Sequence, residues 1–465
     1  MGLLSVQKLR NGETAKPIHL ILSKDRVRSI KRGHPWVFKE SLQDLPAAPE
    51  PGSLALLKDK SGDILAKGFY EPGCNIAFRA IALGKDRLDD NLISERLQRA
   101  LALRRRLFPN PAVTNSFRLV NGEGDGLPGL VIDVYGGHVA VIKTDGPGAT
   151  CFYDIDGIAA WLCQQVLTRS TGSDSSKPKD NTTCFMGVNN NGVMEGNVGK
   201  RGSSGSAPAS VQRLQQCVYH KFRSGDAAGR GRLVSGQLPN LGGEQGVVLM
   251  VENGATFSVD IVQGQKTGFF LDQRDSRALV GRLVTPGSRV LNLFGYTGGF
   301  SIYAGRAGAG HVTTVDVAVP AVKAAERNWE LNGLVPDRHS GRSEDVFTFL
   351  AAAISSREMW DMVVVDPPSF APSKQTKETG GAAYSRLFAL AARVTRSGGM
   401  LALASCSSHM PSEAFGALCV EAVAGTARRT ASVLAMQGQP ADHPFPIACE
   451  ELRYLKFNMY HLDSV

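Results

Sequence analysis

Three features are scarce or missing in this sequence. No run of about 18 consecutive apolar residues occurs, so no membrane-spanning helix is expected. Only eight cysteines occur in 465 residues, and none forms a Cys-x-x-Cys pair. This excludes a zinc ribbon and a disulfide framework, so we expect a reducing compartment and no metal site. The first 18 residues lack the basic-then-apolar layout of a secretory signal, which leaves the cytoplasm or an organelle (chloroplast or mitochondrion) as the expected location.

The composition is that of a folded globular protein. Hydrophobic residues make up 43% of the chain and charged residues 20%, and the length predicts two to four domains at about 100–200 residues each. There are 52 Lys and Arg against 43 Asp and Glu, a net charge of +9. Such an excess suits a polyanionic partner without requiring one.

Changes in local pattern divide the chain. After an N-terminal extension (1–18), residues 19–88 carry short apolar stretches between turn residues, which predicts a small β-rich module. A central α/β region (89–262) is interrupted at 171–210, where 22 of 40 residues are Gly, Ser, Asn or Thr. A segment of that composition buries too little surface to fold, so we interpret it as a disordered insertion.

A helix expected over 88–108 carries five arginines among its apolar positions. They are Arg96, Arg99, Arg104, Arg105 and Arg106. A solvated helix face and a surface that faces phosphates are both open interpretations.

From residue 263 to 465 short apolar strands alternate with helical segments. Expected strands cover 289–294, 312–316, 361–366 and 400–405, with helices over 299–306, 319–331 and 382–396. Strands that are apolar throughout and separated by helices predict a parallel sheet covered on both faces. Ligands of such sheets bind beyond the carboxyl ends of the strands.

The first of these strands runs into a turn that contains Gly298 and Gly299. Their spacing is neither the dinucleotide G-x-G-x-x-G nor a phosphate loop. The next strand ends at Asp316, where a carboxylate can accept hydrogen bonds from ribose hydroxyls. Together the two features predict a cofactor that contains a nucleoside. Further on, Asp345 either caps a helix or accepts from an adenine amino group.

Two more strands end in polar motifs. Asp366 is followed by two prolines, which force the chain out of the sheet and hold the carboxylate at the pocket floor. Cys406 follows the strand 400–405. A free cysteine is more often a small buried hydrophobe, but at a strand end beside Asp366 a thiolate nucleophile is the favoured interpretation. His409 is a candidate for lowering the pKa of this thiol.

Motifs along nearly the whole chain resemble those of the PUA-containing class I methyltransferases that form 5-methylcytosine in large-subunit ribosomal RNA. They lie at 33–38, 121–130, 265–277, 291–300, 366–370, 405–407 and 453–456. The resemblance implies an N-terminal PUA-like domain, a central mixed α/β domain and a C-terminal Rossmann-like domain that binds S-adenosylmethionine.

The resemblance also implies roles for single residues. Gly298 and Gly299 would lie against the methionine moiety, Asp316 would hold the ribose and Asp345 the adenine. The segment 267–274 would close over the cofactor. The full implied cofactor set is Thr267, Phe270, Asp272, Arg274, Asn292, Phe294, Tyr296, Gly298, Gly299, Asp316, Asp345 and Asp366.

Cys406 matches the family nucleophile, which adds to C6 of cytosine while Asp366 assists at N3. Related enzymes place a second cysteine after the Asp-Pro-Pro motif to help release the product. Here that position is Ser369, so release uses another base, for which His409 is only a candidate. Ser369 also argues against an amino-methyltransferase, whose aromatic residue would stand there; in this chain the aromatic is Phe370.

The expected partner is ribosomal RNA of the large subunit. Lys31, Arg32 and Trp36 are candidate RNA contacts, with core packing as the alternative for Trp36. An amino-methyltransferase and a non-catalytic RNA-binding assembly factor remain the rival hypotheses. The exposed β-rich module is also a surface through which a homodimer would form.

Overall fold

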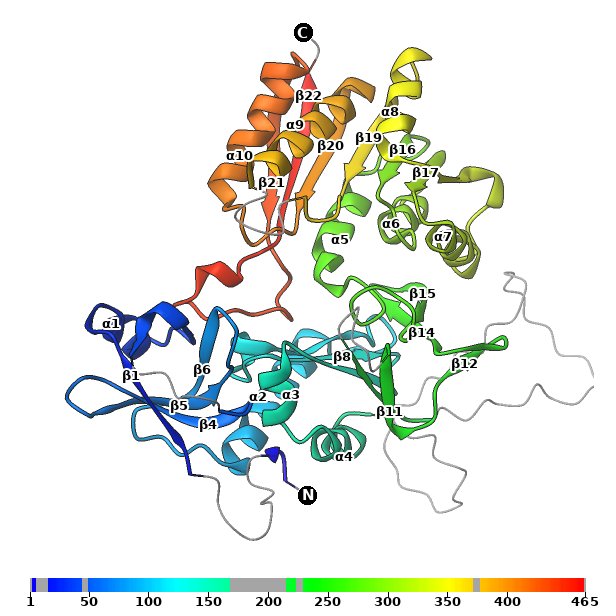
Figure 1. The fold of residues 1–465 in the computed structure, drawn as a ribbon. Helices are drawn as coiled ribbons and strands as arrows, with labels where there is room; N and C mark the ends of the chain where they lie inside the picture. The colour runs from blue at the N-terminus through cyan, green and yellow to red at the C-terminus, as the bar shows by residue number, and fades with distance from the viewer. Residues whose placement is uncertain are drawn as a thin grey trace, which may run out of the picture.

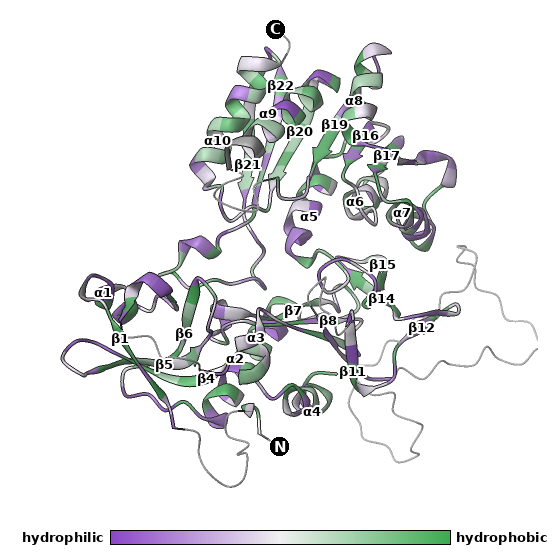
Figure 2. Ribbon diagram, in the orientation of Figure 1, coloured by the Kyte–Doolittle hydropathy of each residue, from purple (hydrophilic) through white to green (hydrophobic). Residues whose placement is uncertain are grey.

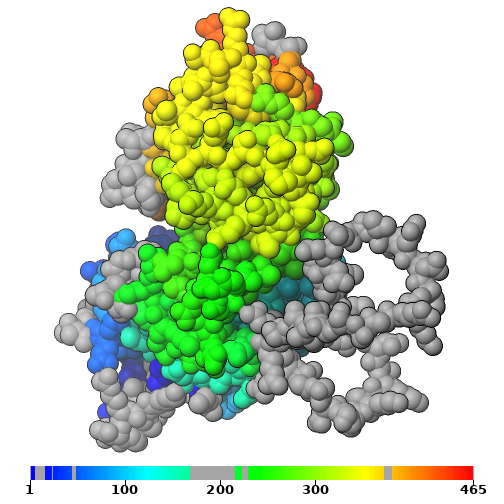
Figure 3. Space-filling model, turned by 90° about the vertical axis from the view of Figure 1, so that its right-hand side faces the viewer, coloured from blue at the N-terminus to red at the C-terminus, as the bar shows by residue number. Residues whose placement is uncertain are grey.

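The computed structural model describes residues 2–5, 16–43, 49–167, 215–222, 229–370 and 377–463. The low-complexity insertion expected at 171–210 lies outside these residues. The chain forms two lobes, with the N-terminal strands below and the C-terminal sheet above (Figure 1). The view from the side shows the same two lobes, with yellow residues above and cyan and blue residues below (Figure 3).

The N-terminal module is a six-stranded sheet with the order β2-β6-β5-β4-β1-β3. Its inward residues, among them Leu20, Leu57 and Phe78, are fully buried and form a core of their own. The elements are β1 (Ile18–Leu22), α1 (Val27–Lys31), β2 (Trp36–Phe38), β3 (Leu42–Gln43), β4 (Ser53–Lys58), β5 (Ile64–Tyr70) and β6 (Ile76–Leu83). The β-rich module expected from the sequence is therefore present.

The central region is a five-stranded sheet with the order β11-β10-β9-β8-β7, and its described residues also form three helices. Leu3 and Leu4 are buried in its core, and their backbone N–H groups donate to Asp90. The elements are α2 (Asp90–Leu107), β7 (Phe117–Asn121), β8 (Leu130–Tyr135), β9 (Val139–Thr144), α3 (Pro147–Phe152), α4 (Ile155–Gln165), β10 (Cys217–Lys221) and β11 (Gly231–Gly236). The N-terminal end of the chain is thus anchored on the central sheet.

The sequence of residues 117–141 predicts two strands joined by the turn-rich segment 121–129, whereas the structure has three strands, β7, β8 and β9, up to Thr144. The turn between β8 and β9 is formed by Gly136 and Gly137, both with positive φ. Consecutive glycines are a hairpin signal, because a tight turn of this kind needs left-handed backbone. The expectation missed this turn.

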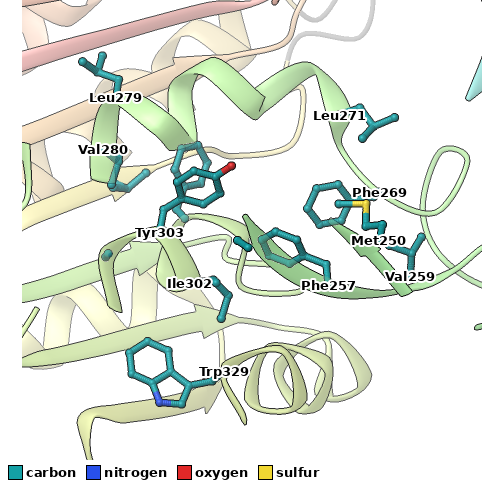
Figure 4. Close-up of a cluster of buried hydrophobic side chains, with 14 of the residues drawn as sticks. Met250, Phe257, Val259, Phe269, Leu271, Leu279, Val280, Ile302, Tyr303 and Trp329 are labelled. Carbon is teal, nitrogen blue, oxygen red and sulfur yellow. The ribbon is translucent and has the colours of Figure 1, made fainter. Parts of the chain in front are cut away.

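A hairpin joins the two lobes. It consists of β14 (Val247–Glu252) and β15 (Ala255–Asp260), and a small ribbon of β12 (Asn240–Leu241) and β13 (Glu244–Gln245) precedes it. Phe257 of the hairpin packs on Phe269 at 5.0 Å between ring centroids (Figure 4). One buried cluster continues from Tyr135 of the central sheet through this hairpin to Tyr303 and Val290 of the upper lobe. Apolar burial therefore fastens the two lobes together.

The C-terminal lobe is a seven-stranded sheet with the order β18-β17-β16-β19-β20-β22-β21. The first five strands run parallel, and β22 is antiparallel to both of its neighbours. The strands are β16 (Arg289–Leu293), β17 (His311–Asp316), β18 (His339–Ser343), β19 (Trp360–Val365), β20 (Thr395–Ser405), β21 (Thr430–Gln437) and β22 (Lys456–Asp463).

Helices flank this sheet, and its inner strands β19 and β20 are coloured hydrophobic (Figure 2). The helices are α5 (Arg274–Leu283), α6 (Gly299–Arg306), α7 (Val319–Leu331), α8 (Val346–Ser355), α9 (Lys377–Val394) and α10 (Ser412–Val420). Strands β16, β17, β19 and β20 match the predicted ones within a few residues. The expected Rossmann-like parallel sheet is confirmed, with one antiparallel strand added near its edge.

The connection from β21 to β22 runs from the upper lobe down to the lower lobe and then back up into β22 (Figure 1). Buried Asp442 accepts from the backbone N–H of Arg118, and the carbonyl of Pro444 accepts from Asn121. His34 of the N-terminal module lies 3.6 Å from Glu451 of the same connection. The C-terminal segment thus binds the N-terminal and central regions before it enters β22.

Candidate active site

A pocket opens at the carboxyl ends of the parallel strands, where the sequence analysis placed the ligand. The ends of β16, β17, β19 and β20 form one wall, and the segment 265–277 forms the other. Its lining residues are Gln265, Lys266, Phe269, Phe270, Asp272, Gln273, Arg277, Phe294, Gly295, Tyr296, Thr297, Gly299, Phe300, Asp316, Val317, Asp366, Pro367, Pro368, Cys406 and Leu455.

The turn after β16 has strained backbone. Phe294 and Tyr296 both have positive φ, 56° and 47°, which side chains of this size rarely adopt. Gly298 has φ 80°, and a Cβ there would lie 2.8 Å from the Cβ of Ala325 on α7. Such conformations cluster at ligand sites and persist only where the surrounding structure enforces them. The turn brings backbone and aromatic side chains to the pocket.

The same turn orients Asp316. One carboxylate oxygen accepts from the backbone N–H of Tyr296 at 2.9 Å, and the other accepts from Ala318 at 2.9 Å. Two backbone donors therefore hold the carboxylate at the end of β17, facing the pocket. Its remaining lone pairs are suited to accept from a vicinal diol.

Asp366 and Cys406 lie at the ends of the neighbouring strands β19 and β20 and line the same pocket. Burial, together with the charge of Asp272, raises the pKa of Asp366 to about 7. Burial and the charge of Asp366 also raise the pKa of the Cys406 thiol. Near neutral pH in the protein alone, the Cys406 thiol is therefore largely protonated and the Asp366 carboxyl is about half protonated.

Tyr384 of α9 ties these two strand ends together, a role that the sequence analysis did not find. Its buried hydroxyl donates to the carbonyl of Pro368 at 3.4 Å and accepts from the Ser405 hydroxyl at 3.3 Å. It therefore links the Asp-Pro-Pro turn to the residue before Cys406.

The opposite wall is built from ion pairs. Asp272 accepts from Lys266 at 2.5 Å and from the Tyr454 hydroxyl at 2.8 Å. Burial would raise the pKa of Asp272, but Lys266 and other nearby cations outweigh it and hold that pKa well below its ordinary value. Arg277 forms a two-pronged pair with buried Glu252, both contacts at 2.8 Å. Lys266 and Arg277 were not among the expected site residues, although both lie in the motif 265–277.

Of the expected cofactor residues, Phe270, Asp272, Phe294, Tyr296, Gly299, Asp316 and Asp366 line the pocket. Five others do not: Thr267, Arg274, Asn292, Gly298 and Asp345. For all of them a direct cofactor contact stays a prediction.

Four of these five residues have side chains that bind other groups of the protein. Thr267 bonds to Asp133 and Tyr135 of the central sheet, and Arg274 pairs with Glu252 and Asp442. The Asn292 side chain donates to Ser301. Asp345 caps α8 by accepting from the backbone N–H of Thr348 at 2.9 Å, which is the helix-capping alternative of the sequence analysis.

The candidate RNA contacts separate into two groups. Lys31 and Arg32 are exposed at the end of α1. Trp36 is half-buried, and its indole N–H donates to Glu123 of the central region at 2.8 Å. The indole N–H of Trp36 is therefore engaged within the protein, whereas Lys31 and Arg32 remain open to a ligand; an RNA contact of all three stays a prediction.

The arginines of α2 divide in the same way. Arg104 is buried against Asp125, and Arg96 donates to backbone carbonyls. Arg99 and Arg106 are exposed and line a groove beside Pro444. His409 is exposed and does not line the active-site pocket.

The pocket suits S-adenosylmethionine. Asp316 presents acceptors for ribose hydroxyls, and one oxygen of buried Asp272 has no hydrogen-bond partner among the described residues, so it can receive the ammonium of an amino acid moiety. A Cβ on Gly299 would lie 3.0 Å from the Arg277 side chain, so glycine keeps the turn and Arg277 close together on this side of the pocket. Phe270, Phe294 and Tyr296 add flat apolar surface for a base.

Comparison with known families agrees with this geometry. Residues 20–82 match the PUA-like domain, and residues 205–433 match the S-adenosylmethionine-dependent methyltransferases. A protein from Streptococcus mutans described as a SAM-dependent methyltransferase has the same fold at a TM-score of 0.73 and 21% identity, over 96% of this chain and 100% of its own. Another methyltransferase, solved in complex with SAH, aligns at a TM-score of 0.74 and 21% identity over the same shares of the two chains.

Curated relatives cover nearly the whole length. The "Ribosomal RNA large subunit methyltransferase" of Deinococcus radiodurans is 34% identical over 454 residues, 97% of this chain and 98% of its own. The "Ribosomal RNA large subunit methyltransferase I" of Alteromonas mediterranea is 33% identical over 94% of this chain and 97% of its own. In the described part of the chain no helix combines the length and apolarity needed to cross a membrane. With both domain models matched in order and relatives aligned over almost all of its length, the chain belongs to the family of S-adenosylmethionine-dependent ribosomal RNA large subunit methyltransferases.

Proposed function

We propose that this protein methylates carbon 5 of a cytosine in large-subunit ribosomal RNA through a covalent bond from Cys406. The observation that carries the proposal is the pairing of a thiol and a carboxyl of raised pKa, Cys406 and Asp366, in one pocket at neighbouring strand ends. The names of the relatives supply the substrate class. A thiol beside an acid suits addition to an electron-poor ring carbon.

The chemistry follows from the poor nucleophilicity of carbon 5. The cofactor supplies an electrophilic methyl group. The Cys406 thiolate adds to C6 while Asp366 donates its proton to N3, which turns C5 into an enamine carbon. After methyl transfer a base removes the C5 proton, Asp366 recovers the N3 proton and the C6–S bond breaks. A carboxyl with a pKa of about 7 can give and regain a proton at neutral pH, which is the property this step needs.

The target base has to leave its stack to reach this pocket, because Cys406 is half-buried and Asp366 lies beyond the strand end. A single-stranded or remodelled RNA therefore suits the site better than a regular duplex. The exposed Lys31 and Arg32 are available to hold the phosphates of such an RNA.

Amino-methylation has weaker support. It would call for an aromatic ring free to stack on the flipped base. The nearest such residue after the Asp-Pro-Pro motif is Phe370, whose ring already packs on Tyr384 at 4.9 Å and on Phe294 at 6.3 Å between centroids.

The test is Cys406→Ala, with Cys151→Ala as the matched control because Cys151 is exposed on α3, away from the pocket. Methyl transfer from labelled S-adenosylmethionine to large-subunit ribosomal RNA is measured alongside cofactor binding by calorimetry. We expect Cys406→Ala to abolish transfer and to retain cofactor binding, and Cys151→Ala to behave as the wild type. Transfer at the wild-type rate by Cys406→Ala would overturn the covalent mechanism.

A further inference from the structure

A buried lysine lies beside Cys406 and has no part in the mechanism above. Lys456 is the first residue of β22 and is 4% exposed. In the antiparallel pairing of β20 with β22 it stands opposite Ser405, the residue before Cys406. An ammonium is costly to bury, so its place at the strand end that carries the nucleophile needs an explanation.

The Lys456 ammonium holds the turn on both sides of the thiol. Its Nζ donates to the carbonyl of Ser407 at 2.5 Å and to the carbonyl of Tyr454 at 2.7 Å. Ser407 directly follows Cys406, while the hydroxyl of Tyr454 donates to Asp272 on the opposite wall. The lysine therefore connects the nucleophile turn with the paired wall of the pocket.

Both of these acceptors are neutral carbonyls. Burial lowers the pKa of the lysine to about 8, and the charge of Cys406 opposes that shift. Lys266, which lines the pocket, is already paired with Asp272 at 2.5 Å. Within the described part of the chain, by contrast, Lys456 forms no ion pair with a carboxylate.

The thiol itself is surrounded by groups that oppose its ionisation. Asp366 from the end of β19 and Asp272 from the facing wall raise the pKa of Cys406, and burial adds to their effect, while Lys266 lowers it. Tyr384 from α9 and Tyr454 from the C-terminal segment also face the thiol. Asp272 and the ionised form of Asp366 therefore oppose a thiolate at this position, and a second cation besides Lys266 would favour it.

We propose that Lys456 is a positioning residue for Cys406, one that fixes the turn 405–407 through its two carbonyl contacts and stabilises the thiolate with its positive charge. This inference rests on the proposed function, in which the thiolate is the attacking group. It adds a residue from β22, outside the lining of the pocket, to the groups that set the reactivity of the nucleophile.

The test measures how fast iodoacetamide alkylates Cys406 as a function of pH, resolved by peptide mass spectrometry in the full-length protein without RNA. The variants are Lys456→Met, Lys456→Gln and Lys456→Arg. The matched control is Lys221→Met: Lys221 is also a buried strand lysine, burial lowers its pKa to about 8, and it donates to a single carbonyl, that of Gly264. Circular dichroism and cofactor binding establish that each variant is folded.

Lys456 carries its charge below its pKa of about 8, so we expect Lys456→Met and Lys456→Gln to slow the alkylation of Cys406 by about three- to tenfold near pH 7, and the difference from the wild type to fade at higher pH. Lys456→Arg keeps the charge and should react at or above the wild-type rate. Wild-type profiles for the Met and Gln variants would overturn the proposal. So would slower alkylation near pH 7 in Lys456→Arg, or an equal loss in Lys221→Met.

The outcome is independent of methyl transfer. If Cys406→Ala still methylated RNA, the proposed function would fail, yet the alkylation profile would still report whether Lys456 stabilises the thiolate. If instead the alkylation profiles coincided while Cys406→Ala was inactive, only the role of Lys456 would fail.

Discussion

Both walls of the active-site pocket carry buried or half-buried ionisable groups, yet the pKa values of these groups shift in opposite directions. In the wall formed by 265–277, Asp272 pairs with Lys266 and Arg277 pairs with Glu252. At the strand ends, Asp366 and Cys406 have raised pKa values. Burial alone raises the pKa of every carboxyl, so an adjacent cation decides the direction. In the wall 265–277 the charged groups are fixed in ion pairs. At the strand ends, Asp366 and Cys406 can hold and release protons.

The largest effect should come from removing the acid at the strand ends. Asp366→Asn is expected to lower turnover by about 10²–10⁴-fold, because the amide cannot give a proton to N3 of the cytosine. Cofactor affinity should stay close to that of the wild type. Labelled methyl transfer and calorimetry measure the two quantities.

Asp361→Asn is the control for that substitution, since Asp361 stands at the other end of β19 in an exposed pair with Arg396. Its turnover should remain near the wild-type value. Equal losses of turnover in both variants would mean that the substitutions act by disturbing β19 and that the Asp366 carboxyl has no specific role.

Breaking an ion pair in the wall 265–277 should lower the stability of the fold more than the rate of the reaction. Glu252→Gln leaves the Arg277 guanidinium buried without its carboxylate, which is expected to lower the free energy of unfolding by about 3–5 kcal/mol. Urea denaturation measures this change. Glu244→Gln, in an exposed pair with Arg327, should cost about 0–1 kcal/mol. Similar small losses for both variants would contradict a structural role for this wall.

The two carboxylates of the pocket should also differ in their pH dependence. Between about pH 4, where an unfolded aspartate titrates, and pH 7, folded Asp366 keeps a proton that the unfolded chain has released. This group therefore lowers stability as the pH rises through that range and has no further effect above it. The Asp366→Asn variant should accordingly be more stable, relative to the wild type, at pH 8 than at pH 5.

Asp272→Asn sharpens the same test. The pKa of folded Asp272 lies below that of the unfolded chain, so its stabilisation is complete above about pH 4 and is lost only on further acidification. The loss in Asp272→Asn should thus be the same at pH 5 and pH 8. A parallel pH dependence in the two variants, from urea denaturation, would refute the contrast between the walls.

The smallest effect concerns the N-terminal module. Trp36→Phe removes the hydrogen bond to Glu123, which keeps its contact with Arg79, so a loss of about 1 kcal/mol in unfolding free energy is expected. RNA affinity should hardly change. The double variant Lys31→Gln, Arg32→Gln should instead weaken RNA binding and reduce its salt dependence, as measured by filter binding at several salt concentrations. A large loss of RNA affinity in Trp36→Phe alone would reverse this assignment.

The sequence was most informative where function depends on the strand ends. The alternation of strands and helices placed Asp316, Asp366 and Cys406 at one edge of a sheet, and they line one pocket. That inference needed only the rule that parallel strands end on the same side. The PUA-like module was equally predictable, because its turns and short strands are local features.

Contacts between distant segments could not be predicted in this way. Thr267 bonds to Asp133 and Arg274 pairs with Asp442, partners that lie 134 and 168 residues away in the sequence. No local sequence pattern predicts such contacts. Lys456 likewise reaches the turn of Cys406 only through the pairing of β20 with β22. The capping role of Asp345 was within reach, since Thr348 follows at the usual spacing, and it stood as one of two alternatives.

The most direct test of the central claim is the identity of the methylated nucleoside. Large-subunit ribosomal RNA methylated by the purified protein is digested to nucleosides and compared with standards by chromatography and mass spectrometry. Bisulfite sequencing then locates the modified position. The account predicts 5-methylcytidine at one position, absent with Cys406→Ala. N4-methylcytidine, or any methylated nucleoside other than a cytidine, would contradict it.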